Sequence, residues 1–194
     1  MEISAKPLKY ASLDGLSEKQ LKEHHDVLYA GYVKKYNEIQ SKLKGLDVSD
    51  ANATFSMIRE LKLEETFALN AIKLHEGYFD CLGSDGKCKG KILQLIENNF
   101  SSFDEWKKQF MAMGISARGW VVLAYDRENK ILRNILCDVH NQGAIWNCIP
   151  LIILDVYEHA YFIDYATNRK AYIDAFMKNI DWSYAEKIID IINL

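Results

Sequence analysis

Two long stretches in the first half of the chain repeat apolar residues every three or four positions, the spacing of one helix face. The first begins after Ser17, which forms a capping-box pattern with Gln20, and the second ends near Asp80. Because only the short polar connector "KGLDVSDAN" separates them, we expect an antiparallel helical hairpin. The expected buried faces carry Leu21, His25, Leu28, Tyr32, Tyr36, Ile39 and Leu43 in the first helix, and Ala68, Ala71, Ile72, His75, Phe79 and Leu82 in the second.

The second half of the chain combines expected helices with short apolar runs typical of strands. We place a domain boundary at the loop "GSDGKCKG", giving a helical hairpin domain at 1–84 and a second domain at 85–194. Helices are expected near Gly90, after Ser102 with its capping partner Glu105, and on both sides of a turn near Asp181. Between them lie three apolar runs, "GWVVLAYD", "KILRNILCD" and "CIPLIIL". The fold class expected is α+β: the N-terminal antiparallel hairpin packs on a C-terminal α/β domain with a three-stranded antiparallel sheet.

Composition argues against several classes of protein. Twenty-four basic and 27 acidic residues give a net charge of −3, too balanced for a nucleic-acid-binding arm. No run approaches the ~20 apolar residues of a membrane span, so we expect neither nucleic acid nor membrane as a partner. The N-terminal residues lack a signal-peptide core, and the four cysteines form no CxxC pair. We therefore expect a cytoplasmic protein with reduced thiols, although Cys81 and Cys88 can lie close in a loop.

The segment "LDVYEHAYFIDY", residues 154–165, places titratable groups directly after an apolar run. Burying such groups costs several kcal/mol unless each finds a partner. One explanation is structural, because Asp155 and Glu158 have the spacing of a helix capping box. Likewise, a single histidine on a buried helix face, such as His75, His24 or His25, is more often a hydrogen-bonded core residue than a ligand.

Taken together, these groups indicate a metal site. If the hairpin packs on the sheet domain, His24, His75, Asp155 and His159 can converge, and imidazoles with one carboxylate suit iron, manganese or zinc. The zinc-protease pattern HExxH is absent, because "HEGYF" lacks its second histidine, and no Glu-x-x-His pair of a di-iron bundle occurs. A helical scaffold that only mediates contacts remains an alternative, but it would not need these histidines.

Through the segment "LDVYEHAYFIDY" and the segments around His24 and His75, the chain resembles the iron/manganese superoxide dismutases over nearly its whole length. "DVYEHAYFIDY" is similar to the family signature D-x-[WY]-E-H-A-[FY]. "HHDVLYAGYV" and "LHEGYF" resemble the ligand segments of its first two helices. "ARGWVVLAYD" resembles its G-x-G-W strand entry, and "NRKAYIDAFMKNIDW" its C-terminal helix pair.

The resemblance implies that His24, His75, Asp155 and His159 bind one iron or manganese ion per subunit, with solvent as a fifth ligand. The implied reaction converts superoxide to dioxygen and hydrogen peroxide. Tyr32 matches the family's gateway tyrosine. Glu158 matches a glutamate that contacts the partner's copy of His159 across a homodimer interface, within a dimer or a tetramer. The alternative function is a non-heme iron oxygenase, with two histidines and one carboxylate.

The chain also departs from the family pattern. Leu28 and Phe162 replace a histidine and a tyrosine that contact each other across the dimer in many relatives, so we expect an apolar contact there. Ala71 stands where some relatives carry a glutamine beside the bound solvent. The turn "CDVHNQGA" offers His140, and secondarily Gln142, as its replacement, with the second His140 nitrogen bonding to Tyr32 or to backbone. Further candidates, for attracting the anionic substrate, are Lys34, Lys35 and Arg169, each of which is also explained as a solvated surface charge.

Overall fold

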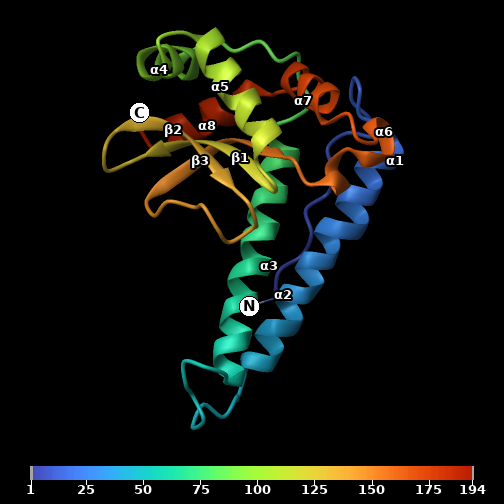
Figure 1. The fold of residues 1–194 in the computed structure, drawn as a ribbon, viewed down its shortest axis with the longest axis vertical. Helices are drawn as coiled ribbons and strands as arrows, with labels where there is room; N and C mark the ends of the chain where they lie inside the picture. Colours follow the sequence, from blue (N-terminus) through green and yellow to red (C-terminus); the bar gives the residue numbers. More distant parts are fainter. Residues whose placement is uncertain (1, 194) are drawn as a thin grey trace.

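A long helical hairpin forms one arm of the molecule, whose computed structural model describes residues 2–193 (Figure 1). The first half of the hairpin contains three consecutive helical segments, and α3 returns beside them. The predicted hairpin is therefore confirmed. Its segments are α1 at Glu18–Lys22, the π-helical η1 at Glu23–Tyr29, α2 at Ala30–Leu43 and α3 at Met57–Asp80.

The π-helical segment shifts the buried face of the first helix. The Ala30 N–H donates to the carbonyl of His25, five residues earlier, so this turn holds more residues than an α-helical turn. As a result Tyr29 and Val33 are buried, whereas the predicted Leu28 and Tyr32 are half-buried. The prediction for the first helix therefore holds at Leu21, His25 and Ile39, whereas four other predicted positions are only half-buried: Leu28, Tyr32, Tyr36 and Leu43. In α3, all the residues predicted to be buried are buried.

The three apolar runs form the expected antiparallel sheet, in the order β2-β1-β3. The central strand β1, Trp120–Asp126, is buried along its whole length. It pairs with β2, Ile131–Cys137, and with β3, Cys148–Asp155. The register places Asp155, the last residue of β3, opposite Trp120. Because the antiparallel ladder fixes both residues at one end of the sheet, the carboxylate of Asp155 is held on a rigid element.

Three of the remaining helices, α4, α5 and α8, contact the sheet, whereas the short helix at Phe162–Tyr165 lies beside α1 (Figure 1). Ser102 caps α5 by accepting from the Glu105 N–H at 3.1 Å, as predicted, and Asp181 caps α8. All four cysteines are free thiols. No helix in the described part of the chain is long and apolar enough to cross a membrane. The domain boundary near residue 84 stays a prediction. The helices are α4 at Lys91–Phe100, α5 at Phe103–Ser116, η2 at Glu158–Ala160, α6 at Phe162–Tyr165, α7 at Arg169–Lys178 and α8 at Trp182–Ile191.

A glycine lets α3 approach the sheet closely. A Cβ at Gly77 would overlap the Cδ1 atom of Ile153 on β3, so a larger residue requires the Ile153 side chain or one of the two elements to shift. The approach matters because α3 carries His75 and β3 ends at Asp155. Gly77 therefore lies at the contact between the two elements that carry these predicted ligands.

We expect Gly77→Ala to destabilise the protein by about 1–3 kcal/mol, because the added methyl group overpacks a buried contact. Urea unfolding of the variant should show this loss. The double variant with Ile153→Val, which removes the overlapping Cδ1 atom, should recover part of it. If the double variant is no more stable than Gly77→Ala alone, the contact with Ile153 is not the reason for the glycine.

Candidate metal centre

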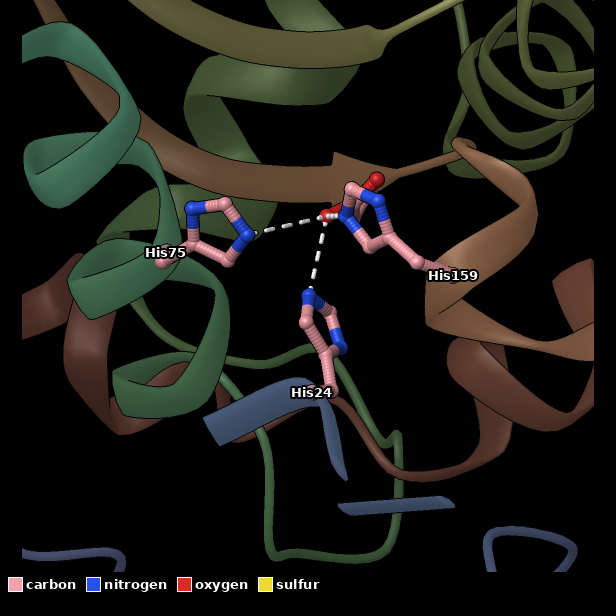
Figure 2. A group of neighbouring side chains, drawn as sticks. His24, His75 and His159 are labelled. Carbon is pink, nitrogen blue, oxygen red and sulfur yellow. Dashed lines mark hydrogen bonds and ion pairs between the residues drawn. The ribbon is translucent and has the colours of Figure 1, made fainter. Parts of the chain in front are cut away.

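Three imidazoles surround one carboxylate oxygen at the junction of hairpin and sheet (Figure 2). The Nε2 atoms of His24, His159 and His75 lie 3.1, 3.2 and 3.6 Å from Oδ2 of Asp155. One potential donor atom from each residue lies within 4.8 Å of all the others. The four predicted residues are therefore brought together.

Each of these groups comes from a different element. His24 lies in η1, His75 in α3, Asp155 at the end of β3, and His159 in the single turn of η2. The side chains of His24, His75 and Asp155 are fully buried, whereas 24% of the His159 side chain is exposed. His25, the other histidine of η1, bonds instead to the carbonyl of Lys6 at 2.9 Å. Of the two neighbouring histidines, only His24 faces the centre.

The hydrogen bonds of His75 indicate that a cation belongs at this centre. Its Nδ1–H donates to the carbonyl of Ala71 at 2.7 Å, which leaves Nε2 with a lone pair facing the Asp155 carboxylate. Two acceptors that face each other in a buried site repel each other unless a positive charge lies between them. Consistent with this, His75 Nε2 is buried without a hydrogen-bond partner among the described residues.

The charges of the centre also suit a metal ion. Burial lowers the pKa of His24 and of His75, so both imidazoles are neutral, the form that binds metals. Burial opposes ionisation of Asp155, but His159 and His24 outweigh it and lower its pKa. Burial likewise opposes the charged form of His159, yet the Asp155 carboxylate raises its pKa. Donors about 2.1 Å from one ion lie about 3.0–3.6 Å apart at angles of about 90–120°, which matches the spacing around Asp155.

The capping-box explanation of Asp155 accounts for only one of its oxygens. Oδ1 accepts from the Tyr157 N–H at 2.9 Å, whereas Oδ2 faces the three imidazoles. Glu158 is exposed and does not cap the following turn, whose N-cap is Tyr157. The carboxylate therefore has two functions, one toward the backbone and one toward the centre.

Tyr32 and His140 form a hydrogen-bonded pair beside the centre. The Tyr32 hydroxyl lies 2.9 Å from His140 Nε2, and its ring lies 5.4 Å from that of His75. The Trp120 indole N–H donates to His140 Nδ1 at 3.0 Å. Burial lowers the pKa of His140 to about 4, so the ring is neutral and its single proton lies on Nε2. Both ring nitrogens are thus engaged with protein groups, and His140 donates to Tyr32 rather than to solvent.

The sequence did not predict all the surroundings of His140. Trp120 was not predicted to contact His140, and its only signal was its position at the start of a buried strand. Gln142, the competing candidate, is exposed, while Asn141 ties the loop to α3 by donating to the Thr66 hydroxyl at 3.1 Å. His140 is therefore the residue of this turn that reaches Tyr32.

The cationic candidates differ in their surroundings. Lys34 and Lys35 are exposed, and Lys35 pairs with Glu38 on the same helix. Arg169 donates to the carbonyl of Ala117 at 2.8 Å and to the hydroxyl of Tyr161 at 3.1 Å. These contacts are sufficient to explain Lys35 and Arg169 without a role in binding.

Comparisons with known proteins agree on one family. Residues 88–188 match the model of iron/manganese superoxide dismutases, C-terminal domain. The chain is 42% identical to a superoxide dismutase [Fe] of Aquifex aeolicus, over 90% of this chain and 84% of that protein. It is 40% identical to a superoxide dismutase [Fe] of Cupriavidus metallidurans, over 95% of each. It is 31% identical to a superoxide dismutase [Mn] of Halobacterium salinarum, over 93% of this chain and 90% of that protein.

We expect the purified protein to hold about one metal ion per chain. The Asp155→Asn variant should lose at least nine-tenths of that metal, because the amide removes the anionic donor. Even replacing a residue that only hydrogen-bonds to a ligand commonly weakens metal binding about 10–100-fold. Elemental analysis of both proteins measures this. Asp126→Asn is the matched control, because Asp126 is another buried carboxylate but pairs with Arg133 at the other end of β1. Equal metal content in Asp155→Asn and the unmodified protein contradicts the assignment.

Proposed function

The chain belongs to the iron/manganese superoxide dismutases, and on this premise we propose that it converts two superoxide ions and two protons to dioxygen and hydrogen peroxide. One iron or manganese ion per subunit is held by His24, His75, Asp155 and His159. The observation that carries the assignment is the lone pair of His75 Nε2 facing a buried carboxylate oxygen. Three imidazoles around that oxygen also argue against the oxygenase alternative, which uses two.

When bound, the metal ion supplies a one-electron couple that oxidises one superoxide and reduces the next. The four proposed ligands together carry only one negative charge, because the three imidazoles are neutral and Asp155 is a carboxylate. The burial of His24 and His75 keeps both rings neutral, so protons compete little with the metal ion for the lone pairs of these rings. Asp155 lies at the end of a paired strand, which limits its movement when the charge of the centre changes.

The protons come through Tyr32 in this proposal. Burial, followed by the charge of Asp155, raises the pKa of Tyr32, so its hydroxyl stays protonated. Because His140 Nε2–H donates to that oxygen, the hydroxyl proton is free to point to the reacting oxygen atoms. Trp120 fixes the tautomer of His140, and His140 in turn orients Tyr32. His140 is thus a positioning residue, and Tyr32 is the donor.

We expect His140→Ala to retain its metal and to lose about tenfold to a hundredfold in turnover, because the hydroxyl of Tyr32 loses the partner that orients it. Tyr32→Phe should show a similar loss. Pulse-radiolysis rates and metal content test both variants. Thr66→Ala is the control, since it removes the other tie of the same loop but leaves His140 in place. Full turnover of His140→Ala with either metal would refute the proposal for that residue.

We also propose a homodimer in which Glu158 contacts His159 of the partner subunit. Glu158 is exposed and has no side-chain partner among residues 2–193, although it adjoins His159, the most exposed of the four proposed ligands. Exposed apolar side chains lie close to it in the sequence, with Phe162 48% and Ile163 45% exposed. Such a patch beside an unpaired acid suits a protein interface. The four free thiols support a cytoplasmic location.

Replacing Glu158 tests that arrangement. We expect Glu158→Ala to weaken self-association and to lower metal retention, because one side chain serves both the interface and the ligand of the partner. Sedimentation velocity over a dilution series, with metal analysis of the same samples, measures the two effects. Glu97→Ala, which removes an exposed acid from α4, is the control. Association and metal content that both match the control would contradict the proposal.

A further inference from the structure

Gln20 is a fully buried glutamine whose side chain reaches the segment of His159. It lies in α1, one helical turn before His24. Its Nε2 atom donates to the carbonyl of His159 at 2.6 Å, and its Oε1 atom accepts from the N–H of Ile163 at 3.0 Å. A buried amide left unpaired costs about 1–3 kcal/mol, so the two bonds also account for its burial.

The sequence suggested a different use for this residue. In a capping box, the side chain of Gln20 would return to the N–H of Ser17. The structure contains only the other half of that motif, in which the Ser17 hydroxyl accepts from the Gln20 N–H at 3.1 Å. The N–H of Ser17 instead donates to Asp164 at 2.7 Å. Because Asp164 satisfies that donor, the Gln20 side chain is available to turn inward.

The Gln20 amide takes the place of one backbone hydrogen bond. The N–H of Ile163 and the carbonyl of His159 are four residues apart, so they would bond to each other in a continuous α-helix. The amide lies between them, accepting from one and donating to the other. A side chain inserted in this way breaks a helix. Here η2 ends at Ala160, and α6 begins only after Tyr161, whose φ of −147° is not helical.

We infer that Gln20 is a positioning residue for His159, an inference that rests on His159 being a metal ligand as proposed above. His159 is the least buried of the four candidate ligands, so packing restrains it least. It lies in a single 3₁₀ turn, and the four-residue α6 that follows is too short to be stable alone. Gln20 ties this turn to the helix that carries His24, and thereby sets the position of one ligand relative to another.

The neighbouring contacts do not replace this tie. The Asp164 carboxylate bonds to Ser17, and the Tyr165 hydroxyl donates to the carbonyl of Gly15 at 2.6 Å. Both restrain α6 against the start of α1, but neither contacts His159. Without the amide, the N–H of Ile163 is free to bond to the carbonyl of His159, which would extend the helix and turn the imidazole.

The test compares metal loss from iron-loaded variants. Gln20→Met keeps the length of the side chain but removes both hydrogen bonds. We expect it to release iron to excess chelator about ten times faster than the unmodified protein, the size of effect usual for a group that orients a ligand. We also expect a changed ferric electron paramagnetic resonance spectrum, which reports ligand geometry directly.

Two control variants distinguish a specific effect on the position of His159 from a general loss of stability. Gln40→Met removes a glutamine contact to Glu65 between α2 and α3, and Asp164→Asn weakens a different contact that restrains α6. Both should keep the spectrum and the release rate of the unmodified protein. An unchanged spectrum and rate in Gln20→Met overturn the inference, as does an equal change in Asp164→Asn, which would show that any restraint of α6 is sufficient.

A measurement on the unmodified holoprotein keeps the inference testable if Gln20→Met does not fold. The Ile163 amide should be protected from hydrogen exchange, since Gln20 is its acceptor, and rapid exchange overturns the contact. The ligand assignment is tested separately by His159→Ala. Slow iron release from His159→Ala refutes the ligand role and this inference together, whereas unchanged behaviour of Gln20→Met alone refutes only the inference.

Discussion

The Asp155 carboxylate, buried with one oxygen among three imidazoles, is the constraint on which the architecture depends. A buried negative charge is costly unless it is paired, and two of its imidazole neighbours are kept neutral by burial. A cation resolves this conflict, so the same arrangement that would destabilise an empty core becomes a strong binding site. The hairpin and the sheet meet at this point, and each carries part of the donor set.

The positions of the donors are fixed by hydrogen bonds one step further out. The carbonyl of Ala71 fixes the tautomer of His75, and the N–H of Tyr157 holds the second oxygen of Asp155. Both of these outer partners are backbone groups, which cannot change rotamer. A metal site needs this rigidity, because small displacements of a ligand change both affinity and redox potential.

The centre is also asymmetric. His24, His75 and Asp155 are fully buried, whereas His159 lies near an exposed apolar edge and depends on contacts from other segments. Tyr32 is half-buried and lies on the side of His75, where Trp120 and His140 support it. In the proposed function the two sides therefore have different roles: the side of His159 completes the ligand set, and the side of His75 carries Tyr32, the proposed proton donor.

The sequence by itself determined the fold class and the members of the centre. The apolar periods predicted the hairpin and the three strands, because burial of a face imposes its spacing on the residues. The motifs shared with the superoxide dismutases indicated the four residues that the structure brings together. Only the tertiary structure showed that the His25 side chain bonds to Lys6, that Trp120 holds His140, and that Gln20 leaves its cap to reach His159. These contacts join residues more than 15 positions apart, or depend on the phase of a π-helical turn, and local patterns contain no information about either.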